Sequence, residues 1–392
     1  MEVKQIYTLM NNVSSEVLGK TDIISEDLTG IVDMGTAVFN ANAIDNYVKS
    51  LVNHIGKVVF VNRPYSGKIP SVLMDAWEFG SVLEKISADI PQAEENDSWD
   101  LTDGTEYKQD VFHKPTVTAK FFNSKVTFEV PVSITERQVK ESFSSASQLN
   151  GFLSMIYNAV EKSMTIKTDA LVMRTINNMI AETLNADKDA FTPSGTQAVD
   201  YTTASTVRCV NLLKLYNDKF SKTLTSEQAI TDPDFIRFAS YTMGLYSDRL
   251  QSISTLFNVG GKERFTPKES LHVVLLSDFA KAAQTYLYSD TYNKQEVLLP
   301  NAETVPSWQA SGKDYAFANV SKIDVKSASG VSVSMGGVLG VMFDRDALGV
   351  CNSDKRVTTN YNAKAEFFNN YYKFDAEYFN DTNENFVVFF VA

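Results

Sequence analysis

Apolar and polar residues alternate strictly between Val126 and Ile134, where every second residue is Val, Phe or Ile and the residues between are Thr, Glu, Pro and Ser. A period of two is typical of a strand with one apolar and one polar face. We therefore predict a hairpin over about residues 80–134, with this strand as its second arm and a polar, acidic tip at about residues 91–115. In the first arm, the apolar residues Val82, Ile86, Ala88 and Ile90 are all at even-numbered positions, so they would share one face of a strand.

An amphipathic pattern follows the hairpin directly. Its spacing of three and four residues predicts a helix over about residues 149–184, roughly 50 Å long if it is unbroken. The polar stretch Thr165–Thr168 weakens the pattern and leaves a kink or break there open. A hairpin this long, ahead of a long helix, has little to pack against in its own chain, so we expect it to contact a neighbouring molecule. The apolar positions of the helix are Leu149, Leu153, Ile156, Val160, Met164, Leu171, Ile176, Met179 and Ile180.

Shorter patterns predict the remaining elements. Asp232-Pro233 is a helix start, because proline suits the first helical position. The polar stretch 185–205 predicts a loop and a candidate domain boundary. Strands are predicted at residues 58–61, 271–276, 331–333, 338–343 and 386–392, and helices at residues 43–54, 207–220 and 277–287.

Composition narrows the class of protein. The chain has 392 residues, of which 44% are hydrophobic and 21% charged, as in ordinary folded proteins. Its net charge of −12 argues against a dedicated nucleic-acid binder, although an acidic wall could enclose nucleic acid without gripping it. Cys209 and Cys351 are too few and too far apart for a disulfide framework or a zinc ribbon. No segment reaches the length of a membrane span and no secretory signal is visible, so no membrane association is expected.

The sequence lacks the usual catalytic motifs. The Gly-Lys pairs at Gly67, Gly261 and Gly312 have neither the upstream glycine nor the hydroxyl residue of a phosphate-binding loop. No nucleophile elbow, zinc-protease or kinase signature occurs. His272 lies in an apolar strand and is interpreted as a satisfied buried residue more readily than as a ligand. We therefore expect no enzyme activity, no cofactor and no metal.

An acidic cluster marks the hairpin tip. Three interpretations are open: a solvated loop, a cation site, or an electrostatic contact with a neighbouring subunit. Asp97, Asp100 and Asp103 are spaced by three, whereas an EF-hand loop alternates its ligands by two and closes with a Glu, which disfavours the cation site. We retain the cluster as the candidate assembly contact: Glu94, Glu95, Asp97, Asp100, Asp103, Glu106 and Asp110.

Taken in order, these elements resemble the major capsid protein of tailed bacteriophages, the Hong Kong ninety-seven fold. The hairpin and long helix carry the resemblance, with the strand-to-helix step at 271–279 and the strand and charged turn at 343–348. It implies an α+β fold with an N-terminal arm, an extended β-hairpin loop, a peripheral domain with a long spine helix, and an axial domain. The implied boundaries are residues 1–72 for the arm and first strand, 73–135 for the hairpin loop, 136–205 for the peripheral domain, 206–340 for the axial domain and 341–392 for the return to the peripheral domain.

The resemblance also implies a function. The protein would be a structural major capsid protein that assembles with itself into hexamers and pentamers of an icosahedral shell around phage double-stranded DNA, without sequence-specific binding. Its further partners would be a portal and a separate scaffolding protein, and it would reside in the virion after assembly in the host bacterial cytoplasm. An encapsulin-like nanocompartment shell and an α/β enzyme or ligand-binding module are the alternatives.

Overall fold

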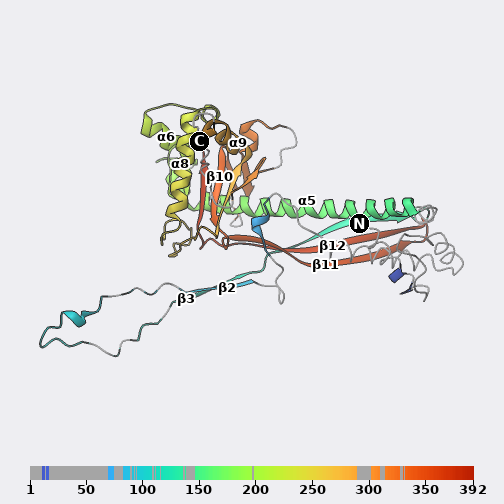
Figure 1. Cartoon of the computed structure of the whole chain (residues 1–392), viewed down its shortest axis with the longest axis horizontal. Coiled ribbons are helices and arrows are strands. Elements are labelled where there is room, and N and C mark those ends of the chain that lie inside the picture. Colours follow the sequence, from blue (N-terminus) through green and yellow to red (C-terminus); the bar gives the residue numbers. More distant parts are fainter. Residues whose placement is uncertain are drawn as a thin grey trace. The chain divides into compact units, whose positions relative to one another are not determined.

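The protein is described from a computed structural model, drawn in Figure 1. The description covers only part of the chain, and it excludes the predicted helix at 43–54 and strand at 58–61. The described residues are 11–13, 15–16, 69–74, 83–88, 91, 93, 95–107, 110, 112–114, 116–135, 137, 146–196, 198–288, 302–309, 314–326, 330 and 332–392.

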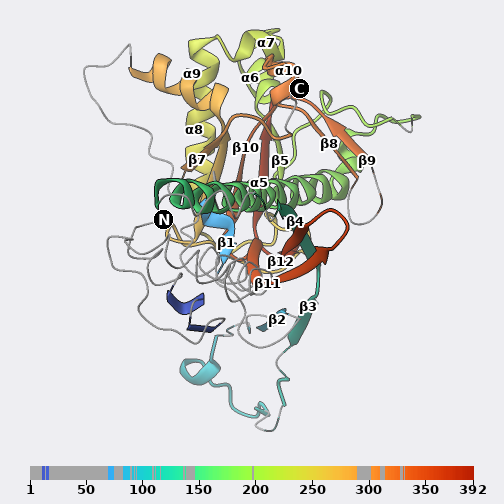
Figure 2. The same cartoon turned by 90° about the vertical axis from the view of Figure 1, so that its right-hand side faces the viewer.

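Helices and strands contribute about equally to the described residues, as a mixed fold requires (Figures 1 and 2). The helices are η1 (Pro70–Val72), η2 (Asp97–Trp99), α5 (Ala146–Ala186), η3 (Lys188–Phe191), α6 (Leu212–Phe220), α7 (Ser226–Ala229), α8 (Pro233–Arg249), α9 (Ser277–Tyr288) and α10 (Phe317–Val320). The strands are β1 (Leu73–Met74), β2 (Leu83–Ala88), β3 (Val117–Phe122), β4 (Lys125–Thr135), β5 (Cys209–Asn211), β6 (Leu271–Leu276), β7 (Ala302–Val305), β8 (Ile323–Lys326), β9 (Ser332–Met335), β10 (Val338–Asp344), β11 (Leu348–Asn362), β12 (Phe367–Asn380) and β13 (Phe386–Phe390).

The chain forms two compact units. The first comprises Met1–Pro70, Lys125–Val172 and Val350–Glu377. The second comprises Ser71–Ser124, Met173–Gly349 and Tyr378–Ala392. Both are therefore assembled from segments far apart in the sequence.

A five-stranded sheet of order β5-β13-β10-β6-β7 forms the core of the second unit. Every residue of β6, β10 and β13 is buried, which explains why these strands are continuous apolar runs rather than alternating ones. Alternate residues such as Val387 and Phe389 face a cluster built with α6, α8 and α9. The opposite face carries Phe390, which packs against Phe191 with ring centroids 6.1 Å apart. The sheet is thus covered on both faces.

Long strands characterise the first unit. β4 pairs with β12 over eleven positions, from Lys125↔Glu377 to Thr135↔Phe367. The cross-strand ring pair Phe128–Phe374 has its centroids 5.1 Å apart, and Lys125 forms a 2.6 Å ion pair with the buried Glu377. Such matched cross-strand pairs stabilise one register over its alternatives.

These contacts correct the predicted hairpin. The strand at 126–134 exists, as β4, but its partner is β12 and not the arm around Ile86. The first arm, β2, pairs instead with β3, from Leu83↔Phe122 to Ala88↔Val117. The alternation of β4 predicted its two faces correctly, but a period of two carries no information about the partner strand.

The predicted long helix is confirmed as α5, and it continues through Thr165–Thr168 without a break. The Thr165 hydroxyl donates a hydrogen bond to the Glu161 carbonyl at 3.0 Å, so it is satisfied within the helix. Thr168 is buried on the same stripe as Met164 and Leu171, where it takes the place of an apolar residue. Two threonines therefore weaken the sequence pattern without interrupting the helix, although the buried Thr168 hydroxyl has no hydrogen-bond partner among the described residues. At 41 residues α5 is about 60 Å long.

Several local predictions are also confirmed. Asp232 caps α8, accepting a hydrogen bond from the Phe235 N–H at 2.9 Å, with proline at the next position. The strand at 271–276 runs directly into α9, and β13 accounts for the terminal apolar run. The predicted helix at 207–220 is shorter, because residues 209–211 form the buried strand β5 before α6 begins. Among the described helices, none is both long and apolar enough to cross a membrane.

We predict that Gly337→Ala destabilises the fold. Gly337 has φ +80°, and a Cβ there would lie 1.9 Å from the Val391 carbonyl oxygen. Left-handed strain of roughly 1–2 kcal/mol adds to this overlap, so urea unfolding should show a loss of at least about 2 kcal/mol. Gly336→Ala is the matched control, since a Cβ there has no described atom within 4 Å. Equal stability of the two variants would contradict the prediction.

We also predict an acid-sensitive contribution from His272. Its side chain is buried on β6 beside Phe343, as expected. Neither ring nitrogen has a hydrogen-bond partner among the described residues, so the expected satisfaction of the ring stays a prediction. Burial, and then the charge of Arg345, lower the pKa of His272. The neutral form is thus favoured in the folded state.

The stabilisation associated with that neutral form is complete above the unfolded pKa of about 6.5 and is lost as pH falls toward the lower folded pKa. Urea unfolding from pH 7 to 5 should therefore show a steeper loss for the wild type than for His272→Leu. His113→Gln, which changes an exposed histidine, should retain the wild-type slope. Identical slopes for wild type and His272→Leu would refute the assignment.

Candidate functional site

The β2–β3 ribbon and its connecting segment form the candidate site. The two strands make a separate two-stranded sheet of six paired positions. Between them the described contacts are local: the Thr102 N–H donates to the Tyr107 hydroxyl at 3.0 Å, and the Thr105 N–H donates to the Thr102 carbonyl at 3.2 Å. The tip is therefore shaped by its own turns.

The predicted acidic residues do not converge. In the described part of the chain, no group of three or more His, Cys, Asp or Glu side chains is arranged to hold a metal ion. Asp97 begins η2, and Glu94 lies outside the described residues. The others are exposed along the tip: Glu95, Asp100, Asp103, Glu106 and Asp110.

Exposed apolar side chains accompany these acids. Trp99 is 98% exposed and Phe112 87% exposed, and Leu101 is also exposed. A solvated loop has no need of large apolar side chains, and their exposure at the tip is consistent with an interaction surface. From the sequence we singled out the carboxylates and missed these apolar residues, although they lie between the acidic residues in the sequence.

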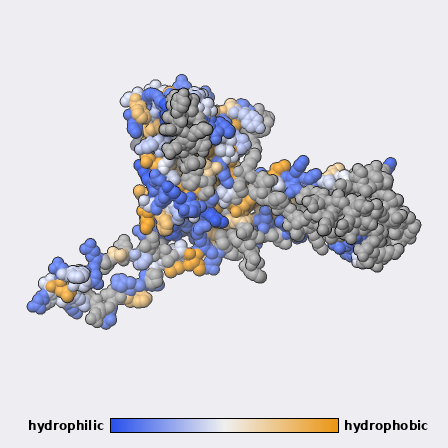
Figure 3. Space-filling model, in the orientation of Figure 1, coloured by the Kyte–Doolittle hydropathy of each residue, from blue (hydrophilic) through white to orange (hydrophobic). Residues whose placement is uncertain are grey.

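The ribbon itself has one apolar and one polar face. Ile86, Val117, Ala119 and Phe121 are exposed, with Ile86 and Phe121 each at 64%. Glu84 is exposed on this same face. The other face carries Lys85, Ser87, Thr118, Lys120 and Phe122, which are half-buried, and the Phe122 ring lies 5.2 Å from that of Phe379. Figure 3 shows the hydrophobic surface along the ribbon and a largely hydrophilic tip. The face rich in apolar residues thus points to solvent and the face with the two lysines points toward the protein, the reverse of the usual arrangement.

Two carboxylates from a segment distant in the sequence form ion pairs with the lysines of the ribbon. Lys85 Nζ lies 3.0 Å from Asp381 Oδ2 and 2.8 Å from Glu384 Oε1. Lys120 Nζ lies 2.9 Å from Asp381 Oδ1. Glu384 also accepts from Arg264 Nε at 3.3 Å. Both carboxylates belong to the turn between β12 and β13. Sequence patterns describe near neighbours, so they could not predict that this turn contacts residues 85 and 120.

The electrostatics of this cluster favour its charged form. Burial works to raise the pKa of Asp381, but the hydrogen bonds from Lys120 and the Asn383 N–H, with the charge of Lys85, outweigh it and lower the pKa. For Lys85, burial works to lower the pKa, and the hydrogen bonds and charges of Glu384 and Asp381 raise it overall. Both groups therefore remain ionised across the neutral range.

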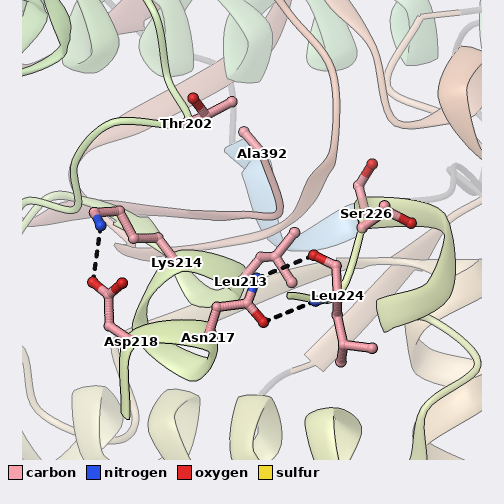
Figure 4. A pocket seen from close by; sticks show the side chains of 9 residues that line it. Thr202, Leu213, Lys214, Asn217, Asp218, Leu224, Ser226 and Ala392 are labelled. Atoms are coloured by element: carbon pink, nitrogen blue, oxygen red, sulfur yellow. Dashed lines mark hydrogen bonds and ion pairs between the residues drawn. The ribbon is translucent and has the colours of Figure 1, made fainter. Parts of the chain in front are cut away.

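A pocket of about 350 Å³ lies elsewhere in the second unit, between α6, the start of α7 and Ala392 (Figure 4). Lys214 Nζ pairs with Asp218 Oδ2 at 2.9 Å across its rim. Asn217 exchanges two hydrogen bonds of 3.1 Å with the backbone of Leu224. Its polar groups thus satisfy one another, and the pocket offers no set of groups converging on a ligand.

Comparison with known proteins identifies the family. A model of the Phi29-like phage major capsid protein family matches residues 8–390. Among curated proteins no match was found. A chain in the capsid structure of Staphylococcus phage Andhra has the same fold, with 8% identity, coverage of 84% of this chain and 86% of that chain, and a TM-score of 0.50. A chain in the structure of head fiber and inner core protein gp22 of native bacteriophage P68 has 7% identity, 85% and 86% coverage, and a TM-score of 0.49.

The family match spans nearly the whole sequence, and the Andhra chain shares the mixed helix-and-strand capsid fold that the order of elements predicted. The expected resemblance is confirmed. The chain belongs to the Phi29-like phage major capsid protein family and is a structural protein of a phage capsid shell.

Proposed function

We propose that the protein assembles into hexamers and pentamers of an icosahedral shell that encloses phage double-stranded DNA, and that the hairpin of β2, the tip and β3 binds a neighbouring copy. A portal and a separate scaffolding protein are its further partners, and assembly takes place in the host bacterial cytoplasm. The exposed apolar surface of the hairpin is the observation that supports the contact.

The energetics favour this role. Ile86, Val117 and Phe121 expose more than half of their area, as do Trp99 and Phe112. Burying such a side chain contributes about 1.5–3 kcal/mol. A closed symmetric shell repeats each contact in every subunit, so modest contacts add up across the lattice.

We assign the acidic residues of the tip to the rim of the contact with the neighbouring copy. Exposed charges steer association and select partners more than they add affinity. The candidates remain Glu94, Glu95, Asp97, Asp100, Asp103, Glu106 and Asp110. The net charge of −12 also suits a wall that packs DNA without gripping it.

The domain assignments are part of the proposal. We assign residues 1–72 to the N-terminal arm, 136–205 to the peripheral domain with α5 as its spine helix, 206–340 to the axial domain and 341–392 to the return. Within the hairpin loop of 73–135, β2 and β3 form the ribbon, and β4 belongs to the long sheet with β12.

The other functions considered are less well supported. The family match does not favour an encapsulin-like compartment or a ligand-binding enzyme. A structural role is not usually enzymatic, and we propose that the protein has no catalytic activity.

Deleting residues 92–114 and joining Pro91 to Pro115 by a short Gly-Ser linker should leave a folded subunit that forms no stable shells. The tip makes local contacts, so the unfolding midpoint of the unassembled subunit should match that of the wild type. Negative-stain microscopy provides the assembly measurement. Particles of normal size and yield would contradict the role of the tip.

Neutralising Asp100, Asp103, Glu106 and Asp110 as amides should slow assembly, most strongly at low ionic strength. An exposed ion pair contributes only about 0.2–1 kcal/mol, and salt near 0.5 M should remove most of the difference in rate because it screens exposed charges. Light scattering gives the rates. Lys114→Gln is the matched control, since it neutralises an exposed base on the same segment and should not slow assembly. An equal loss of rate in the control would argue against acidic steering.

A further inference from the structure

Two lysines lie directly opposite each other on the β2–β3 ribbon. The strand register pairs Lys85 with Lys120. Like charges directly opposite in an antiparallel pair destabilise it. The arrangement therefore needs a counter-charge placed between the two ammonium groups.

Asp381 provides that counter-charge. Its two carboxylate oxygens are divided between the lysines, Oδ2 at 3.0 Å from Lys85 and Oδ1 at 2.9 Å from Lys120. The Asp381 side chain is 2% exposed, so the pairing is shielded from solvent on the carboxylate side. Lys85 also donates to the Asp346 carbonyl at 3.1 Å, and Lys120 to the Thr382 hydroxyl at 3.3 Å.

The backbone fixes the position of the carboxylate independently of the ribbon. The Asp381 N–H donates to the Ala347 carbonyl at 2.7 Å, and the Asn383 N–H donates to Asp381 Oδ1 at 3.0 Å. Glu384, three residues on, joins Lys85 to Arg264. The ribbon thus meets a preformed acidic turn rather than a flexible side chain.

We propose that Lys85 and Lys120 are positioning residues for assembly, clamped by Asp381 and Glu384 so that the apolar face of the ribbon is presented to the next copy of the chain. The inference rests on the proposed function, because it assumes that the ribbon is a contact surface. The inference goes further than the proposed function because it identifies the residues that determine the orientation of the ribbon. The clamp selects orientation because both lysines lie on one face of the ribbon, whereas the charged residue of the exposed face, Glu84, is acidic and could not pair with Asp381 or Glu384.

Charged groups suit this task better than apolar ones. An ion pair of this kind adds little net stability, since desolvation offsets much of its attraction. Removing Asp381 leaves three bases with Glu384 alone, and this uncompensated positive charge strongly disfavours the bound position. Phe122 adds an apolar contact with Phe379 on the clamped face, but apolar residues occur on both faces of the ribbon, so the lysines are what distinguish the inner face from the outer one.

Hydrogen exchange in the unassembled subunit tests the clamp. Asp381→Asn keeps the oxygen that accepts from the Asn383 N–H but removes the charge between the lysines. We expect amides of β2 and β3 to exchange about tenfold faster or more, with amides of β6, β10 and β13 unchanged. Lys120→Ala gives a second, milder variant in case Asp381→Asn does not fold. It removes the β3 contacts with Asp381 and Thr382 and should show the same direction, with a smaller effect because it also relieves the repulsion of Lys85.

Two controls sharpen the test. Lys120→Arg keeps the charge and should retain the exchange rates of the ribbon and normal assembly. Glu129→Gln removes the 3.3 Å cross-strand pair with Lys373 on β4 and β12, and should leave β2 and β3 unaffected. Assembly of every variant is followed by light scattering, and Asp381→Asn should form shells more slowly and in lower yield.

The outcomes separate the two proposals. Unchanged exchange in both Asp381→Asn and Lys120→Ala would overturn the clamp. Faster exchange with normal assembly would overturn the positioning role. If deletion of the tip leaves assembly normal while Asp381→Asn impairs it, the tip contact of the proposed function fails and the positioning role stands.

Discussion

The docking of β13 between β5 and β10 is the interaction on which the second unit depends. All five of its residues are buried, and Phe386 stacks on Phe343 of β10 with ring centroids 5.7 Å apart. The turn before it is bound at both ends, by a 2.8 Å hydrogen bond from the Gly260 N–H to the Thr382 carbonyl and by a 3.0 Å bond from the Asp344 N–H to the Asn385 carbonyl. Because the turn is held by the core sheet, its two carboxylates occupy fixed positions before any partner reaches them.

The inverted ribbon is a consequence of those fixed carboxylates. A two-stranded ribbon ordinarily buries its apolar face, and a pair of strands alone is marginally stable in water. Here the face with the lysines is the one held, because Asp381 and Glu384 offer opposite charge to Lys85 and Lys120, and because Phe122 on the same face packs against Phe379. The apolar face then stays in water in the single subunit, an unfavourable state that a neighbouring copy would relieve.

Sequence patterns predicted those features that depend on near neighbours. The helix α5, the cap of α8 at Asp232 and the buried strands β6 and β13 follow from periodicity and capping residues within a few positions. The partner of β4 could not be predicted, because its alternation is compatible with any strand that offers an apolar face. The acidic turn was missed for the same reason, since Lys120 and Asp381 are separated by 261 positions.

The candidate site combines two kinds of interaction with different ranges. Exposed carboxylates such as Asp100 and Asp103 act across a Debye length of about 8–10 Å in physiological salt, and so influence the approach of a partner. The apolar groups Ile86 and Phe121 act only on contact, where water is displaced from both surfaces. Carboxylates at the tip would therefore govern mainly the rate and selectivity of association, and the ribbon face its persistence. Since the clamp acts on the ribbon and not on the tip, its loss should shorten the lifetime of the contact more than it slows the encounter.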